Sequence, residues 1–205
     1  LSIEMGARTG MVAPDDTTRE WLAAHGAPHV DVAPWHSDAG ALGTRHQWNA
    51  GTLAPQVALP HSPANARAVT DVEPTPADVA YIGACTGAKL DDLRAAAQVL
   101  RGHKVASGIR LIVAPASLHD QEQAREEGVL QVLMDAGAEL FPTACGACSG
   151  YGDPMGDGIT VISTTARNFK GRMGSPTAQV YLGSPYTVAA AALRGCVTDP
   201  REVLA

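Results

Sequence analysis

This 205-residue sequence lacks an excess of positive charge. It contains 15 lysines and arginines and 21 acidic residues, which give a formal net charge of −6. A chain with this balance has no general attraction for nucleic acid or an anionic membrane surface, so we expect neither as a partner. An anionic small molecule is still compatible with it, because a local group of arginines can outweigh a weak overall field.

Long apolar runs are also missing. No segment approaches the roughly 18 consecutive apolar residues of a membrane-spanning helix. No basic start is followed by an apolar run, as a signal peptide would require. We therefore expect a cytoplasmic protein without a membrane anchor.

Aromatic residues are scarce at 4%, whereas hydrophobic residues make up 45% and glycine occurs 21 times. This mixture favours helices packed closely on a sheet, with backbone-rich loops. Only four cysteines are present, and we expect reduced thiols or a metal site rather than disulfides, because no export signal accompanies them. They are Cys85, Cys145, Cys148 and Cys196.

Residues 1–76 are irregular and rich in Gly, Pro, His and Asp. Prolines interrupt regular elements there, although a short helix is expected over residues 16–24, capped by Asp15 or Asp16. A segment of this kind cannot easily fold alone. We expect it to be the irregular tail of a second domain that packs on a partner chain.

Residues 77–205 alternate between buried-strand and helix patterns. Strands are predicted at 78–85, 109–116, 138–141 and 158–164, and helices at 89–102, 117–137 with a break near Gly128, and 184–195. This alternation predicts an α/β domain with a mostly parallel sheet covered on both faces.

Ligands of such sheets bind at the carboxyl ends of the strands, where three loops with unusual chemistry are expected. The first contains Cys85, the second spans residues 143–153 with Cys145 and Cys148, and the third spans residues 163–176. The convergence of these loops predicts a functional site at this edge.

The Cys145-x-x-Cys148 spacing places two sulfurs within reach of one metal or cluster, and Cys85 can supply a third. Three protein ligands would leave one metal position open, as a catalytic site requires. The same residues also fit ordinary buried thiols, a redox pair or half of a zinc site. Cys196, which follows a helix-ending glycine, is interpreted as a core thiol.

Arg167, Lys170 and Arg172 lie together in the third loop. Guanidinium forks bind carboxylates in bidentate fashion, so beside an open metal position they predict a polycarboxylate site, while alone they fit a solvated basic turn. Glu4, flanked by small residues, could act on a metal-bound water or hydroxyl. On spacing alone it also fits a surface acid.

With these motifs assembled, the chain resembles the aconitase superfamily, and most of all the large-subunit branch of isopropylmalate dehydratase and homoaconitase. The matching blocks are LSIEMGARTGMVAPDDTT, the segment from YIGACTG to LIVAPAS, TACGACSG and STTARNFKGRMGSP. The resemblance covers essentially the whole chain and implies a three-layer aconitase-like α/β domain.

The resemblance further implies a [4Fe–4S] cluster held by Cys85, Cys145 and Cys148, whose remaining iron acts as a Lewis acid on the hydroxyl of a hydroxy di- or tricarboxylic acid. The implied activity is that of a hydro-lyase, a dehydratase or isomerase. Glu4 and Arg167 match catalytic positions, and Arg167, Arg172 and Asn168 match the substrate-binding loop.

Three departures from the family pattern accompany the resemblance. Gly87 and Ala166 stand where the family usually has asparagine, so two amides near the cluster or substrate are absent, which should alter cluster tuning or substrate fit. The family also has a long N-terminal large-subunit region and a swivelling domain, and other subunits are expected to supply them. The alternatives are a cluster-free or single-metal lyase and a non-catalytic metal-binding regulatory module.

Overall fold

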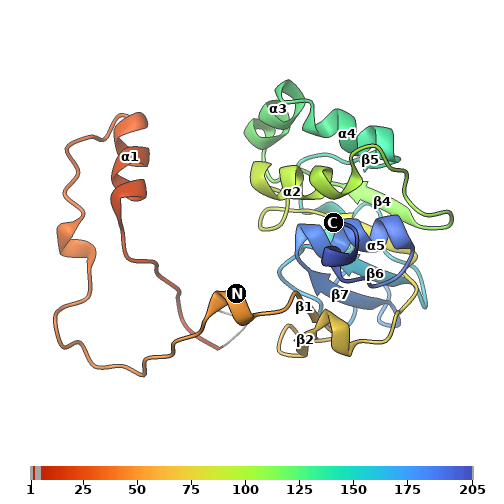
Figure 1. Ribbon diagram of the computed structural model, residues 1–205, viewed down its shortest axis with the longest axis horizontal. Coiled ribbons are helices and arrows are strands. Elements are labelled where there is room, and N and C mark those ends of the chain that lie inside the picture. The colour runs from red at the N-terminus through yellow and green to blue at the C-terminus, as the bar shows by residue number, and fades with distance from the viewer. Residues whose placement is uncertain (1, 3–5, 205) are drawn as a thin grey trace. The chain divides into compact units, whose positions relative to one another are not determined.

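The computed structural model of the protein describes residue 2 and residues 6–204 (Figure 1). The chain forms two compact units, Leu1–Leu53 and Ala54–Ala205. No helix among the described residues is both long and apolar enough to cross a lipid bilayer.

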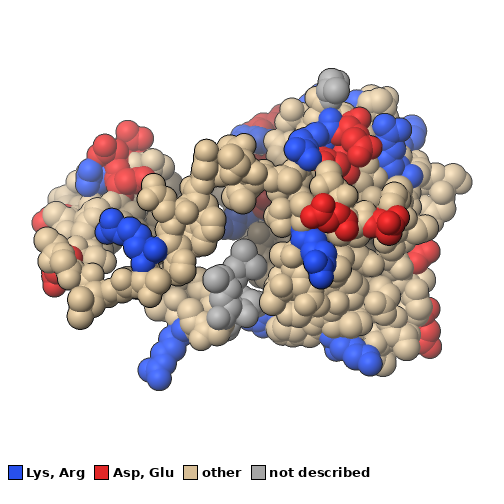
Figure 2. Space-filling model, turned by 60° about the horizontal axis from the view of Figure 1, so that its bottom comes forward, with Lys and Arg blue, Asp and Glu red and all other residues tan. Residues whose placement is uncertain are grey.

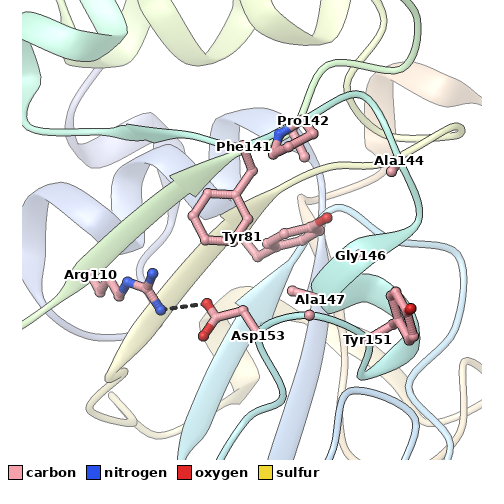
Figure 3. A pocket seen from close by; sticks show the side chains of 11 residues that line it. Tyr81, Arg110, Phe141, Pro142, Ala144, Gly146, Ala147, Tyr151 and Asp153 are labelled. Carbon is pink, nitrogen blue, oxygen red and sulfur yellow. Dashed lines mark hydrogen bonds and ion pairs between the residues drawn. The ribbon is translucent and has the colours of Figure 1, made fainter.

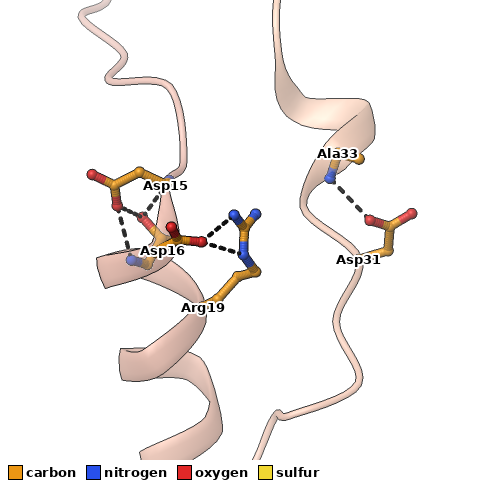
Figure 4. Close-up of polar contacts among 6 residues, drawn as sticks. Asp15, Asp16, Arg19, Asp31 and Ala33 are labelled. Carbon is orange, nitrogen blue, oxygen red and sulfur yellow. Dashed lines mark hydrogen bonds and ion pairs between the residues drawn. The ribbon is translucent and has the colours of Figure 1, made fainter.

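The first unit contains the predicted helix, α1 (Asp16–Ala24), and short 3-10 turns at Ala33–Trp35 and Ala50–Thr52. Asp15 is the cap, because its carboxylate accepts the backbone N–H of Thr18 at 3.0 Å (Figure 4). This hydrogen bond lowers the pKa of Asp15 below its ordinary value. None of the residues of α1 is buried, so the unit has little core of its own.

The second unit is built on a seven-stranded sheet with the order β2-β1-β7-β6-β3-β4-β5. The five strands from β7 to β5 are parallel, and β1 and β2 add an antiparallel edge. The α/β class and the mostly parallel sheet predicted above are confirmed. The strands are β1 (Gln56–Ala58), β2 (Ala66–Ala68), β3 (Val79–Ile82), β4 (Arg110–Val113), β5 (Glu139–Leu140), β6 (Thr160–Ser163) and β7 (Gln179–Gly183).

The compact unit begins at Ala54, whereas the sequence places the domain boundary between residues 76 and 77. The difference arises because β1 pairs with β7, with Val57 opposite Gly183 and Ala58 opposite Leu182. Val57 is fully buried, so residues 54–76 extend the sheet of the α/β domain. Packing of the N-terminal segment on a partner chain stays a prediction.

Four helices, α2 (Leu90–Leu100), α3 (Leu118–Glu126), α4 (Val129–Ala136) and α5 (Pro185–Arg194), form one layer of the unit (Figure 1). They pack on Ala80 and Ile82 of β3 and on alternate residues of the neighbouring strands. The break predicted at Gly128 separates α3 from α4, and it falls on a residue whose φ of 73° favours glycine. Ser117 and Ser184 cap α3 and α5 through their side chains.

The opposite face of the sheet is covered by loops instead of helices. Val79, Tyr81 and Ile112 pack there against Ala147 and Met173, which lie in the connections after β5 and β6. The chain steps from β3 to β4 to β5 in one direction and from β6 to β7 in the other. Right-handed crossovers then place the two sets of connections on opposite faces, and a ligand crevice is expected where the direction reverses, between β3 and β6.

Charged side chains of both signs are intermingled on the surface (Figure 2). Arg94 of α2 binds Glu127 at 2.5 Å and lowers the pKa of that carboxylate, and Arg110 of β4 binds Glu139 of β5 at 2.6 Å. Because these pairs are largely exposed, each contributes little to stability, but both join neighbouring elements of the unit.

Candidate metal centre

The cysteines and arginines singled out in the sequence lie in loops that leave the carboxyl ends of β3, β5 and β6. Cys85 follows β3, Cys145 and Cys148 follow β5, and the arginine loop follows β6. Cys85 and Cys145 are exposed and Cys148 is partly buried. The loops from β3 and β6 leave the sheet at the reversal point, where ligand binding is expected.

A 3-10 turn, Gly146–Ser149, carries the paired cysteines. Ala147 is buried against the sheet and anchors the turn, and Gly150 ends it with a φ of 70°. A Cβ atom on Gly150 would lie 2.8 Å from the backbone nitrogen of Gly174, so only glycine lets the cysteine turn approach the end of the arginine loop this closely.

Thr164, which sequence reasoning missed, fixes the Cys85 loop. Its buried hydroxyl accepts the N–H of Gly83 at 2.9 Å and donates toward the carbonyl oxygens of Gly83 at 2.8 Å and Gly87 at 2.7 Å. The first residue after β6 therefore holds the β3 loop on both sides of Cys85. The only signal in the sequence is a threonine directly after a buried strand.

Replacing Thr164 by valine should lower the free energy of unfolding by about 1–3 kcal/mol, because buried backbone groups of the Cys85 loop lose their partner. Chemical denaturation of the metal-free chain measures this change. Thr70→Val, at an exposed threonine of the same unit, should change stability by no more than about 0.5 kcal/mol. Equal stability of the Thr164 variant and the wild type would show that this hydroxyl does not anchor the loop.

Gly87 has no room for a side chain. A Cβ atom there would lie 2.1 Å from the backbone oxygen of Thr164, far inside any allowed contact. This close approach gives a physical reason for glycine at a position where the family usually has asparagine, because the Cys85 loop here closes directly on the backbone after β6.

Gly87→Asn should therefore displace the Cys85 loop and lower the free energy of unfolding by about 1–3 kcal/mol, as overpacking does. Gly156→Asn is the matched control, since a Cβ atom at Gly156 meets only Ile159 at an ordinary 3.7 Å. Thermal and denaturant unfolding of both variants make the comparison. A Gly87 variant as stable as the control would mean that the loop adapts to the side chain.

The charges around Cys148 act on its thiol. Burial raises the pKa of Cys148, the guanidinium of Arg172 opposes this increase, and the charges of Cys145 and Cys85 add to it. Arg172 Nη2 lies 3.8 Å from the Cys148 sulfur, and the buried Nε of the same guanidinium has no hydrogen-bond partner among the described residues. The structure thus places a guanidinium beside the Cys148 thiol.

Asn168 holds the arginine loop against the sheet. Its side chain is fully buried, and its amide nitrogen donates to the carbonyl oxygens of Leu59 at 2.8 Å and Val180 at 3.0 Å. Both N–H bonds of the Asn168 amide are thereby used within the chain, and this arrangement supports the loop. Substrate contact by the Asn168 side chain stays a prediction. Arg167, the residue before it, is partly buried. Glu4 lies outside the described residues, so its catalytic role also stays a prediction.

Within the part of the chain that the structure describes, no three His, Cys, Asp or Glu side chains are grouped closely enough to hold one metal ion. The chemistry of the donor set fits an iron–sulfur cluster. Thiols are its usual ligands, and the nearby Arg172 suits a negatively charged group.

Comparison with known proteins gives matches along the whole chain. The model of the aconitase family (aconitate hydratase) matches residues 1–78 and 72–195. The large subunit 1 of 3-isopropylmalate dehydratase from Archaeoglobus fulgidus is 41% identical over 99% of this chain and 49% of its own length. The large subunits from Oleidesulfovibrio alaskensis and Desulfitobacterium hafniense are 41% and 38% identical over 98% and 100% of this chain, and 48% of their own lengths. The chain spans about half the length of the curated relatives it matches.

Proposed function

This chain belongs to the aconitase family, and from that premise we propose that it is the cluster-bearing component of a split hydro-lyase acting on a hydroxy di- or tricarboxylic acid. The observation that carries the proposal is that loops at the carboxyl ends of β3, β5 and β6 carry the three thiols and Arg172, with Arg172 Nη2 lying 3.8 Å from the Cys148 sulfur. The first substrate to test is 3-isopropylmalate, because the relatives are named as 3-isopropylmalate dehydratases.

Cys85, Cys145 and Cys148 would hold a [4Fe–4S] cluster, which when bound supplies a Lewis acid at the iron without a protein ligand. Arg172 and Arg167 would bind and orient the substrate carboxylates, because guanidinium forks match carboxylate geometry. Asn168 would keep the arginine loop in register through its two backbone hydrogen bonds. Glu4 would hold or accept the proton exchanged at the substrate.

Partner chains are part of the proposal, because the relatives are named as large subunits, which implies a small subunit. That small subunit would supply the swivelling domain. The first unit offers surface for such packing. Its Trp21 and Trp35 side chains are 59% and 56% exposed, although tryptophan is usually well covered. A cytoplasmic location stays a prediction.

Anaerobic purification of the full chain together with any co-eluting chains tests the proposal. We expect roughly four irons and four sulfides per chain with a brown, reducible absorption spectrum. The assembled complex should dehydrate 3-isopropylmalate. Zinc, or no metal, in a chain that elutes alone would contradict the proposal and favour a cluster-free lyase or a regulatory module.

A further inference from the structure

Tyr81 carries a buried hydroxyl that has no hydrogen-bond partner among the residues that the structure describes. The residue lies on β3 and is fully buried on the face of the sheet that the loops cover. Its ring borders a cavity of about 470 Å³, but its oxygen is shielded from solvent. A buried hydroxyl without a partner costs free energy, whereas phenylalanine would fill the same space without this cost. The hydroxyl therefore suggests a ligand that accepts its proton.

The hydroxyl lies directly beneath the cysteine loops. A Cβ atom on Gly83 would meet the Tyr81 ring at 2.5 Å and its oxygen at 2.7 Å, so the segment leading to Cys85 passes over the ring. Figure 3 shows the oxygen pointing toward the segment that contains Ala144 and Gly146, the two neighbours of Cys145. The phenol is thus enclosed by the loops that supply the three thiols.

The electrostatic surroundings of Tyr81 also place its hydroxyl near the three cysteines. Burial raises the pKa of Tyr81 most, and the charges of Cys148, Cys145 and Cys85 raise it further, with Cys148 the strongest of the three. The backbone N–H of Cys148 also acts on the phenolic oxygen, although not in hydrogen-bond geometry. Cys148 also packs against the core cluster that contains Tyr81, so its sulfur is an acceptor within the same packed region.

We propose that the Tyr81 hydroxyl donates a hydrogen bond to the Cys148 thiolate when the three cysteines hold their cluster. Cys148 would then be bound from two sides, by Tyr81 and by Arg172. Tyr81 is a positioning residue in this assignment, since it acts on a ligand and not on the substrate. The inference rests on the proposed function, because it needs the cluster to be bound.

Two measurable properties follow from this bond. A donor to a ligand sulfur stabilises the more negative, reduced cluster and so raises its reduction potential. The bond also holds the sulfur in place, and loss of an outer-shell partner typically weakens metal binding about 10- to 100-fold. Neither property depends on turnover.

The test compares Tyr81→Phe with the wild type in the full chain, reconstituted anaerobically with iron and sulfide. We expect the variant to load the same amount of iron, to have a more negative reduction potential, and to lose iron to a chelator about 10-fold faster or more. Tyr186→Phe is the matched control, because its hydroxyl donates to Gln98 at 3.2 Å and Tyr186 packs in the helix-side core. Its potential should equal that of the wild type.

Each other outcome is decisive. If Tyr81→Phe loads fully and keeps the wild-type potential and iron-loss rate, the inference is overturned and the proposed function stands. If the metal-free variant is less stable than the metal-free wild type, the hydroxyl is a structural group and the inference is also overturned. If the wild type itself binds no cluster, both the proposed function and the inference are overturned.

Discussion

Replacing Cys85 by serine is expected to reduce the iron content of the reconstituted chain from roughly four atoms to near background. Cys85 would be the one ligand from the β3 loop, so its loss would leave only the sulfurs of Cys145 and Cys148, which lie close together at the turn Gly146–Ser149. A serine hydroxyl is a harder ligand with a much higher pKa and does not replace a thiolate. Iron and sulfide analysis with the absorption spectrum measures the effect.

The metal-free fold should survive this substitution, because Cys85 is exposed and its loop is held by Thr164. Circular dichroism and denaturant unfolding should therefore match the wild type. Cys196→Ser is the matched control. Its sulfur lies 3.6 Å from the Thr198 hydroxyl, after α5, and the variant should load fully. Full loading of the Cys85 variant would show that the ligand set is wrong.

The loops that carry the site could be located from the sequence because the central strands have clear apolar patterns. β3, β4 and β6 are short apolar runs that end at glycine, serine or a cysteine-containing loop, and the helices after them have clear caps such as Ser117 and Ser184. Parallel strands bring their carboxyl ends to one edge, so the chemistry of those loops predicts a site without any distance being known.

The strands β1, β2 and β7 were not predicted, for identifiable reasons. β1 and β2 have three residues each and lie among prolines, too short for a periodic pattern. In β7 only Val180 is fully buried, so the segment lacks the continuous apolar run of a central strand. The strands predicted from the sequence therefore end with residues 158–164, whereas in the structure residues 163–176 lie in the connection between β6 and a further strand, β7.

The support of the site depends on contacts between distant segments. Thr164 bonds to residues 77 and 81 positions away in the chain, which only the pairing of β3 with β6 makes possible. Sequence shows that Gly87 departs from the family pattern, while the position of the Thr164 carbonyl explains it. The burial of the Tyr81 hydroxyl is likewise set by the β5 loop folding back over β3.

Replacing Arg172 by lysine is expected to lower kcat/KM for the proposed substrate about 100-fold in the complex with its partner chains. Lysine keeps the positive charge but loses the planar fork. Arg172 Nε is buried and has no hydrogen-bond partner in the described part of the chain, so a substrate carboxylate is the acceptor we expect for it.

Because Arg172 Nη2 also lies 3.8 Å from the Cys148 sulfur, activity has to be expressed per bound cluster. This correction separates the loss of substrate binding from the loss of iron. Arg194→Lys, the same exchange at an exposed residue in the last turn of α5, should leave kcat/KM unchanged. Unchanged activity per cluster in the Arg172 variant would show that Arg172 interacts with Cys148 and does not bind the substrate. Arg167 would then be the guanidinium that orients the substrate.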